Sequence, residues 1–161
     1  MLHEFSQARH WLVQDKFRFI VFLEVAAAGF LVALMLAEEL GFGQSGHDLQ
    51  PSPMKIASLA AAGGAVSGLL LSGWFGRAGI AGWGFAVLAS VLSPVLAGAI
   101  GGSLVAPGLG TVWGAIMPML LFVHLKPFAV WLGCLFIIHL HVRHLRRRDL
   151  DQNKIGPSVF E

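Results

Sequence analysis

Charge and cysteine are both scarce in this sequence. Only 12% of its 161 residues are charged and 56% are hydrophobic, whereas a soluble domain carries about 25% charged residues. Because a water-exposed surface needs more charge than this, the composition predicts that lipid surrounds most of the chain. The mean hydropathy of +0.73 points the same way. Spans of about 20 residues each leave too little length for a separate soluble domain.

The single cysteine, Cys134, lies within an apolar run. One cysteine excludes an intrachain disulfide and a cysteine metal cluster, and a buried thiol is usually inert. The sequence also lacks a hydrolase nucleophile elbow, a phosphate-binding loop and paired acidic residues for two-metal chemistry. We therefore expect no catalytic residues, no metal site and no self-contained catalysis.

Three segments follow from the distribution of charge. Residues 1–18 carry both signs of charge and have apolar residues at helical spacing, which favours an amphipathic cytoplasmic segment over a frayed tail. This start does not resemble a cleavable signal, so we expect it to be retained. Residues 19–143 are predicted to form a single transmembrane helical domain, and residues 144–161 a basic cytoplasmic tail. The predicted fold is an all-α integral membrane protein.

The number of spans depends on residues 78–142, which contain one formal charge and are long enough for three helices. With four spans, only Lys55 and Lys126 lie outside the cytoplasm or in the membrane, whereas five spans divide the basic residues almost evenly. The positive-inside rule therefore favours four spans, with five as the alternative. The cytoplasmic basic residues would be Arg9, Lys16, Arg18, Arg77, Arg143, Arg146, Arg147, Arg148 and Lys154.

Four spans leave residues 101–126 too long for a simple loop. The glycines and prolines of this segment predict a re-entrant or surface element on the outer side. The alternative is the kinked first half of a long helix, with kinks at Pro118 and Pro127. Irregular backbone at membrane depth persists only where protein or a wet cavity surrounds it. We therefore expect this segment to be the one most relevant to function.

Small residues recur at every fourth position in two segments. This spacing lets two helix backbones come close, and packing rather than hydrophobicity drives helix association in lipid. Both stripes are predicted to be helix-contact faces, within the chain or toward a partner subunit. The predicted packing positions are Gly64, Gly68, Ser72 and Gly76 in the first stripe and Gly98, Gly102, Gly110 and Gly114 in the second.

Three ionisable residues form the candidate ion, proton or ligand site. Glu24 lies about six residues into the first span, where an ionisable group is expected to face protein or water. His124 and Lys126 form a polar notch in an apolar stretch. The structural alternatives are a carboxyl group hydrogen-bonded between helices for Glu24, and a lysine that snorkels to the interface for Lys126.

Histidines precede the arginines near the end of the last span. His139 and His141 are candidate haem or quinone contacts, although their spacing directs them to different sides of a helix. The first three spans contain no histidine, so haem b or a quinone is expected only with a partner chain. The structural alternative is an interfacial belt of histidines beside the basic cluster Arg146, Arg147 and Arg148.

These features favour a small accessory or anchor subunit of a larger membrane complex, for example in electron transport or transport. The alternatives are a component of an ion or solute channel or transporter, and a haem- or quinone-binding anchor of an oxidoreductase. The expected location is the inner membrane of a bacterium, with both termini cytoplasmic. The expected partners are the lipid bilayer, other membrane subunits or copies of the chain, and anionic lipids at the basic tail, but not nucleic acid.

Overall fold

The computed structural model describes residues 2–42 and 51–155, with side chains for residues 16–42 and 51–149. All regular elements in these ranges are helical. They are α1 (Leu2–Glu39), α2 (Pro53–Leu71), α3 (Gly79–Val105), α4 (Leu109–Ile116), the 3₁₀ helix η1 (Met117–Phe122) and α5 (Leu125–Ile155). The predicted all-α fold is therefore confirmed.

Four helices are long and apolar enough to cross a membrane, whereas α4 and η1 together form a shorter apolar segment. This count matches the preferred prediction of four rather than five. The apolar stretches of these helices are Lys16–Glu39, Pro53–Leu71, Gly79–Val105 and Leu125–Asp149.

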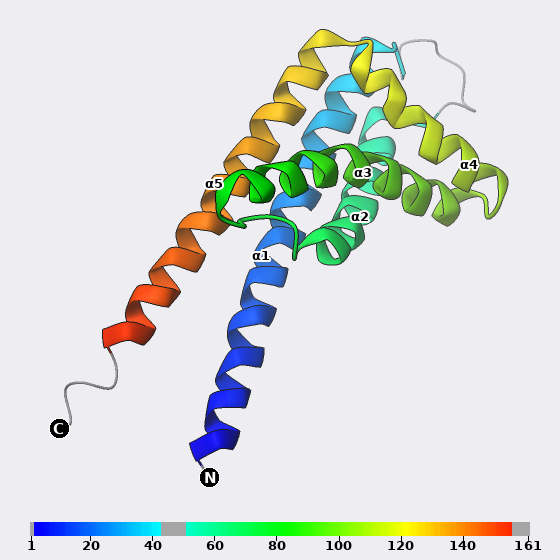
Figure 1. Cartoon of the computed structure of the whole chain (residues 1–161). Helices are drawn as coiled ribbons and strands as arrows, with labels where there is room; N and C mark the ends of the chain where they lie inside the picture. The colour runs from blue at the N-terminus through cyan, green and yellow to red at the C-terminus, as the bar shows by residue number, and fades with distance from the viewer. Residues whose placement is uncertain (1, 43–50, 156–161) are drawn as a thin grey trace.

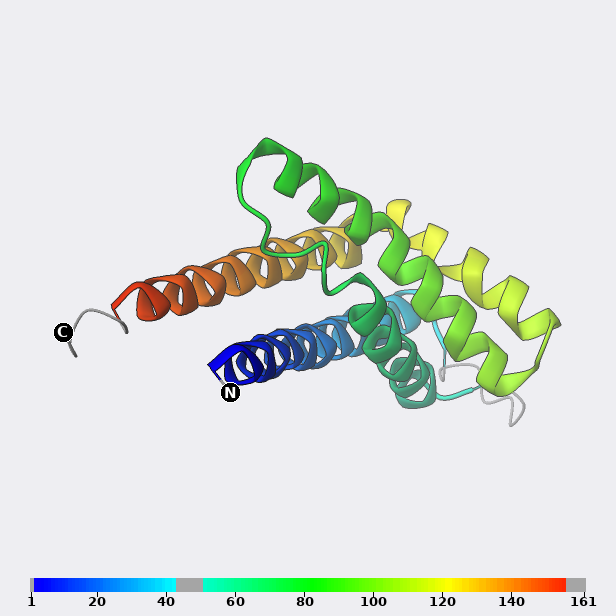
Figure 2. The same ribbon diagram turned by 60° about the horizontal axis from the view of Figure 1, so that its bottom comes forward.

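The helices form a bundle with one oblique member. The start of α1 and the end of α5 lie at the same end of the molecule, and α3 crosses in front of α1 and α2 (Figure 1). Seen from below, α3 and the α4–η1 segment lie side by side and project away from the start of α1 (Figure 2). Both α1 and α5 are continuous across residues 18–19 and 143–144, so no helix break marks the segment boundaries predicted from charge.

Proline and glycine positions explain where the helices begin and turn. Ser52 accepts a hydrogen bond from the Lys55 backbone N–H at 3.3 Å, and Pro53 occupies the first turn of α2, as expected for a helix start. Gly108 has a φ of 85° in the tight turn before α4, a conformation that favours glycine. Residues 101–126 therefore contain the end of α3, this turn, α4 and η1, and they fold back on α3.

Glycine contacts hold the helix pairs together. In α2, an added Cβ at Gly64 would lie 2.9 Å from the Val25 carbonyl oxygen, and one at Gly68 would lie 3.0 Å from that of Val21. One side of α2 therefore packs directly on the α1 backbone. Two further glycines, Gly63 and Gly101, lie at the crossing of α2 and α3, where an added Cβ at Gly101 would be 2.9 Å from the Leu59 carbonyl oxygen.

The two halves of the second stripe, one in α3 and one in α4, pack against each other. Added Cβ atoms at Gly98 and Gly102 of α3 would overlap the carbonyl groups of Gly114 and Gly110 of α4, respectively. The stripe is thus divided between two antiparallel helices that pack backbone to backbone.

Two polar contacts tie α3 to the rest of the bundle. The hydroxyl groups of Ser67 in α2 and Ser93 in α3 lie 3.2 Å apart, and both residues are buried. The Trp131 indole N–H of α5 donates to the Ser90 carbonyl oxygen of α3 at 3.2 Å. Each contact satisfies polar groups that would otherwise be unpaired in an apolar interior.

Candidate functional site

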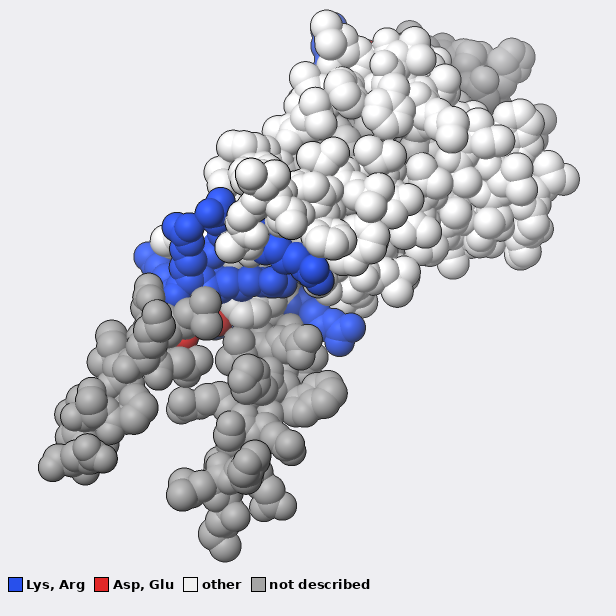
Figure 3. All heavy atoms as spheres, in the orientation of Figure 1, with Lys and Arg blue, Asp and Glu red and all other residues white. Residues whose placement is uncertain are grey.

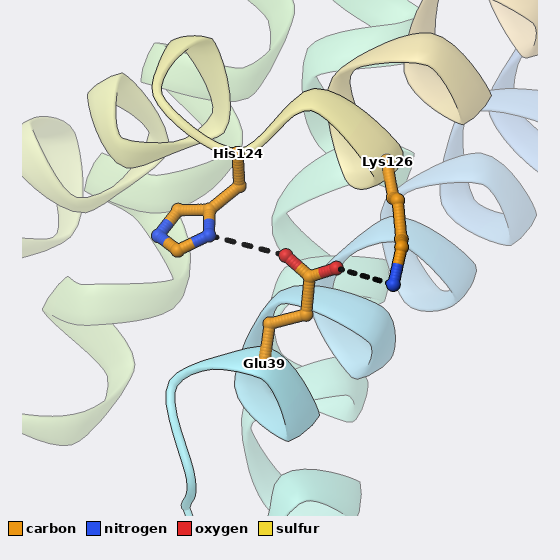
Figure 4. A network of polar contacts seen from close by, with 3 residues as sticks. All are labelled: Glu39, His124 and Lys126. Carbon is orange, nitrogen blue, oxygen red and sulfur yellow. Dashed lines mark hydrogen bonds and ion pairs between the residues drawn. The ribbon is translucent and has the colours of Figure 1, made fainter.

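His124 and Lys126 come together with Glu39 at one end of the bundle. Glu39 ends α1, and the other two residues flank the start of α5 (Figure 4). The His124 Nδ1 lies 3.1 Å from Glu39 Oε2, and the Lys126 Nζ lies 4.0 Å from Glu39 Oε1. The Lys126 side chain is 84% exposed, against 28% for His124 and Glu39. The contact of Glu39 with His124 is therefore the closer of the two, and the Lys126 ammonium group remains free to contact another group.

An apolar cavity of about 450 Å³ lies near the same end of α1, and its lining includes neighbours of Glu39 and His124 in the sequence but none of Glu39, His124 and Lys126. It lies between the α1–α2 pair and the α3–α4 hairpin, beside the crossing of α2 and α3. Its volume is in the range typical of small-molecule sites. Leu36, Ala37 and Leu40 of α1 line it and flank Glu39 in the sequence. Leu121, one turn before His124, lines it as well. The cavity therefore extends toward the Glu39–His124–Lys126 network.

The cavity wall is almost entirely hydrocarbon and aromatic. Trp113 of α4 and Trp131 of α5 contribute indole rings, and Ser93 is one of the few polar lining residues. Its hydroxyl group is already within hydrogen-bonding distance of Ser67. A wall of this kind favours a hydrocarbon ligand over an ion or a polar solute, because an ion there would lose its hydration without replacement ligands.

Glu24 lies toward the other end of the bundle and pairs with His141. The His141 Nδ1 contacts Glu24 Oε1 between α5 and α1. The second carboxylate oxygen of Glu24 is buried and has no hydrogen-bond partner. The candidate site of three ionisable residues thus divides into two locations, with Glu24 in one and His124 and Lys126 in the other.

His139 occupies a different environment from His141. Its side chain is 1% exposed, and its Nδ1 accepts a hydrogen bond from the Gly76 backbone N–H at 3.3 Å. The Trp83 ring lies 4.3 Å from the imidazole, centroid to centroid. The Nε2 atom is buried without a partner. Haem or quinone binding at this histidine, shared with a partner chain, remains a prediction.

The described residues contain no group of three or more His, Cys, Asp and Glu side chains placed to hold a metal ion. Glu39 is the member of the polar network that the sequence reading missed. It ends a span in an acidic pair and lies 85 residues from His124, so no local spacing connects the two. The only available signal was its position at the same predicted membrane face as His124.

Comparison with known proteins adds no assignment. The chain has no significant similarity to a protein-family model, to a curated protein or to a solved structure.

Proposed function

We propose that the four long helices cross the inner membrane of a bacterium, with the start of α1 and the end of α5 in the cytoplasm. The support is the distribution of charge. Lysine and arginine side chains gather in a band at the lower margin of a large uncharged surface (Figure 3). Such a band is expected on the cytoplasmic side. Among the basic residues that the sequence assigned to the cytoplasmic side, the structure describes the side chains of Lys16, Arg18, Arg77, Arg143, Arg146, Arg147 and Arg148.

Within this membrane, the protein binds a quinone whose tail occupies the cavity. The observation that carries this function is the apolar cavity of about 450 Å³ with donor groups close to one end. The isoprenoid tail lies among the α1, α3 and α4 side chains, and the ring lies toward His124 and Lys126. A quinone carbonyl oxygen accepts hydrogen bonds, which an imidazole N–H or an ammonium group donates.

Charge at this end favours a neutral headgroup over a phosphate. The Glu39 carboxylate lies between His124 and Lys126 (Figure 4) and would repel a phospholipid phosphate. A quinone carries no charge in its oxidised form, so it avoids this repulsion. A neutral ring beside the network and a hydrocarbon tail in the cavity would bring no additional charge into lipid.

Tryptophan fluorescence tests this function. Purified protein in nanodiscs is titrated with a ubiquinone analogue that has a ten-carbon tail, because a quinone quenches indole emission at short range. Saturable quenching is expected from Trp113 and Trp131, which line the cavity. Ala33→Phe, which fills the cavity from α1, is expected to weaken binding at least about tenfold. Non-saturable quenching, identical in both proteins, would exclude the quinone site.

The matched control is Ala27→Phe. Ala27 is exposed on the same helix and does not line the cavity, so this variant is expected to bind as the original chain does. Mass spectrometry of lipids that copurify provides a further outcome. A phospholipid retained by the original chain and lost from Ala33→Phe would replace the quinone as the occupant and contradict the proposal.

A second candidate function is that of a complex subunit, and one exposed feature of α5 favours it. Ala129 and Gly133 lie one turn apart on α5, both exposed, and no atom lies within 4 Å of an added Cβ at Gly133. The predicted stripe glycines, in contrast, pack within the chain. A small-residue pair facing lipid fits a helix of another subunit. Gly133→Leu should then release copurifying subunits in mild detergent, while Gly84→Leu, on α3, should not.

A further inference from the structure

Three arginines gather around the turn between α2 and α3. Arg77 belongs to this turn and donates through Nε to the Gly73 carbonyl oxygen at 2.8 Å. Arg146 of α5 donates to the Ser72 carbonyl oxygen at 3.5 Å. Arg143, one turn before Arg146, has a buried Nε without a hydrogen-bond partner among the described residues. The three guanidinium groups therefore come from two distant parts of the sequence.

Close backbone packing brings these parts together. Gly76 has a φ of 71°, and a Cβ added to it would lie 3.0 Å from the Arg143 backbone nitrogen. The same glycine donates its N–H to His139. The turn that carries Arg77 is thus held directly against α5, beside Arg143. His139 is itself buried, with Nε2 unpaired.

Among the described side chains, the ion pairs involve His124, Lys126 and His141, with Glu39 or Glu24 as the acid. None of the three arginines has a described carboxylate partner. Arg143 and Arg146 are half-buried and Arg77 is exposed. Guanidinium groups that lie close together and partly away from water are costly unless an anion compensates them. The ion pair of Glu24 among the described side chains is with His141, between α1 and α5, and not with any of these arginines.

We propose that Arg77, Arg143 and Arg146 bind the phosphate of an anionic phospholipid headgroup between the α2–α3 turn and α5. Guanidinium groups present paired N–H donors that match phosphate oxygens. The band of lysine and arginine side chains adjoins the large uncharged surface (Figure 3), and in a bilayer the phosphates would lie at that depth. This site is at the end opposite the Glu39–His124–Lys126 network and depends on membrane insertion but not on quinone binding.

The test compares two double variants of equal charge change. Full-length protein in mild detergent is titrated with phosphatidylglycerol or cardiolipin, and native mass spectrometry measures the bound fraction. Arg143→Gln with Arg146→Gln is expected to weaken binding about 25-fold, from about fivefold for each arginine. Arg147→Gln with Arg148→Gln, at exposed positions, is expected to weaken it less than about threefold. Equal losses in the two variants would overturn the site, because they would indicate attraction to net charge alone.

Two further experiments distinguish a lipid phosphate from a free phosphate, and a loss of binding from a loss of folding. Inorganic phosphate at millimolar concentration is expected neither to bind nor to displace the lipid, and displacement would assign the site to a free phosphate instead. Arg143→Lys with Arg146→Lys keeps the charge and is expected to retain part of the affinity. If the lysine variant elutes as the original chain does, keeps its helical circular dichroism and binds no more lipid than the glutamine variant, then guanidinium geometry is required. If the original chain retains no anionic lipid, the proposal fails.

Discussion

Gly98 and Gly114 face each other backbone to backbone across the α3–α4 hairpin. A Cβ added to either residue would overlap the carbonyl group of the other. The two helix backbones are in direct contact at this point. The hairpin therefore depends on the absence of a Cβ at two positions that are 16 residues apart.

Gly98→Leu is expected to destabilise the protein by about 3 kcal/mol, at the upper end of the cost of overpacking, because the obstacle is backbone rather than a flexible side chain. Thermal unfolding in detergent, followed by circular dichroism, measures this. Gly84→Leu is the control, since it lies on the same helix with open space around an added Cβ. Equal unfolding temperatures for the two variants would contradict the hairpin contact.

The hydroxyl pair of Ser67 and Ser93 is expected to contribute modestly to stability. Interhelical hydrogen bonds in membrane proteins contribute about 0.6 kcal/mol on average and up to about 1.7 kcal/mol. Ser67→Ala and Ser93→Ala should each cost an amount in this range, and the double variant should cost less than their sum. Ser58→Ala, at an exposed position on α2, should change stability little. Strict additivity of the first two would show that the hydroxyl groups do not interact.

Glu24 and His141 should be coupled in a double-mutant cycle. The contact joins α1 to α5, but both side chains are partly exposed, so we expect a coupling energy of about 1 kcal/mol. Glu24→Gln, His141→Gln and the double variant, compared by unfolding in detergent, provide the cycle. His144→Gln serves as the control, because His144 is exposed on the same helix. If the coupling energy between Glu24 and His144 equalled that between Glu24 and His141, the direct contact of Glu24 with His141 would be contradicted.

Labelling with a membrane-impermeant maleimide should place the two ends of α5 on opposite sides of the membrane. Cys134 is first replaced by serine, and single cysteines are then introduced as Lys126→Cys and Arg148→Cys. In intact cells, the cysteine at position 126 should react and the one at position 148 should react only after permeabilisation. The reverse pattern would invert the proposed orientation, and labelling of both in intact cells would exclude a crossing by α5.

The helices were accessible to prediction because hydropathy is a local property. Long apolar runs bounded by charge identify spans without any knowledge of neighbours, and the structure has four such helices. The sequence also indicated irregular backbone somewhere in residues 101–126 from the glycines and prolines there, and the turn between α3 and α4 lies in this range. The fourfold spacing of small residues indicated contact faces, although it could not indicate which helix would meet each face.

The second stripe shows what spacing leaves undecided. Residues 98–114 keep a regular interval that would suit one continuous helix, yet the turn at Gly108 divides them between α3 and α4. Gly63 and Gly101 lie outside the two stripes and still make close contacts. A helix contact involves two helix faces, and the spacing of small residues identifies one face without identifying the helix that packs against it.

Composition and the order of charges along the chain were enough to determine that this protein is helical, apolar enough for lipid and basic mainly at one end. Each of these properties depends on residues that are close together in the sequence. Only the tertiary structure decided that Glu39 meets His124 and that His139 packs on Trp83 while His141 meets Glu24. It also decided that a cavity lies between the two helix pairs. The physical reason is that these relationships depend on how whole helices cross. The crossing is set by backbone contacts at a few glycines, between segments that are distant in sequence.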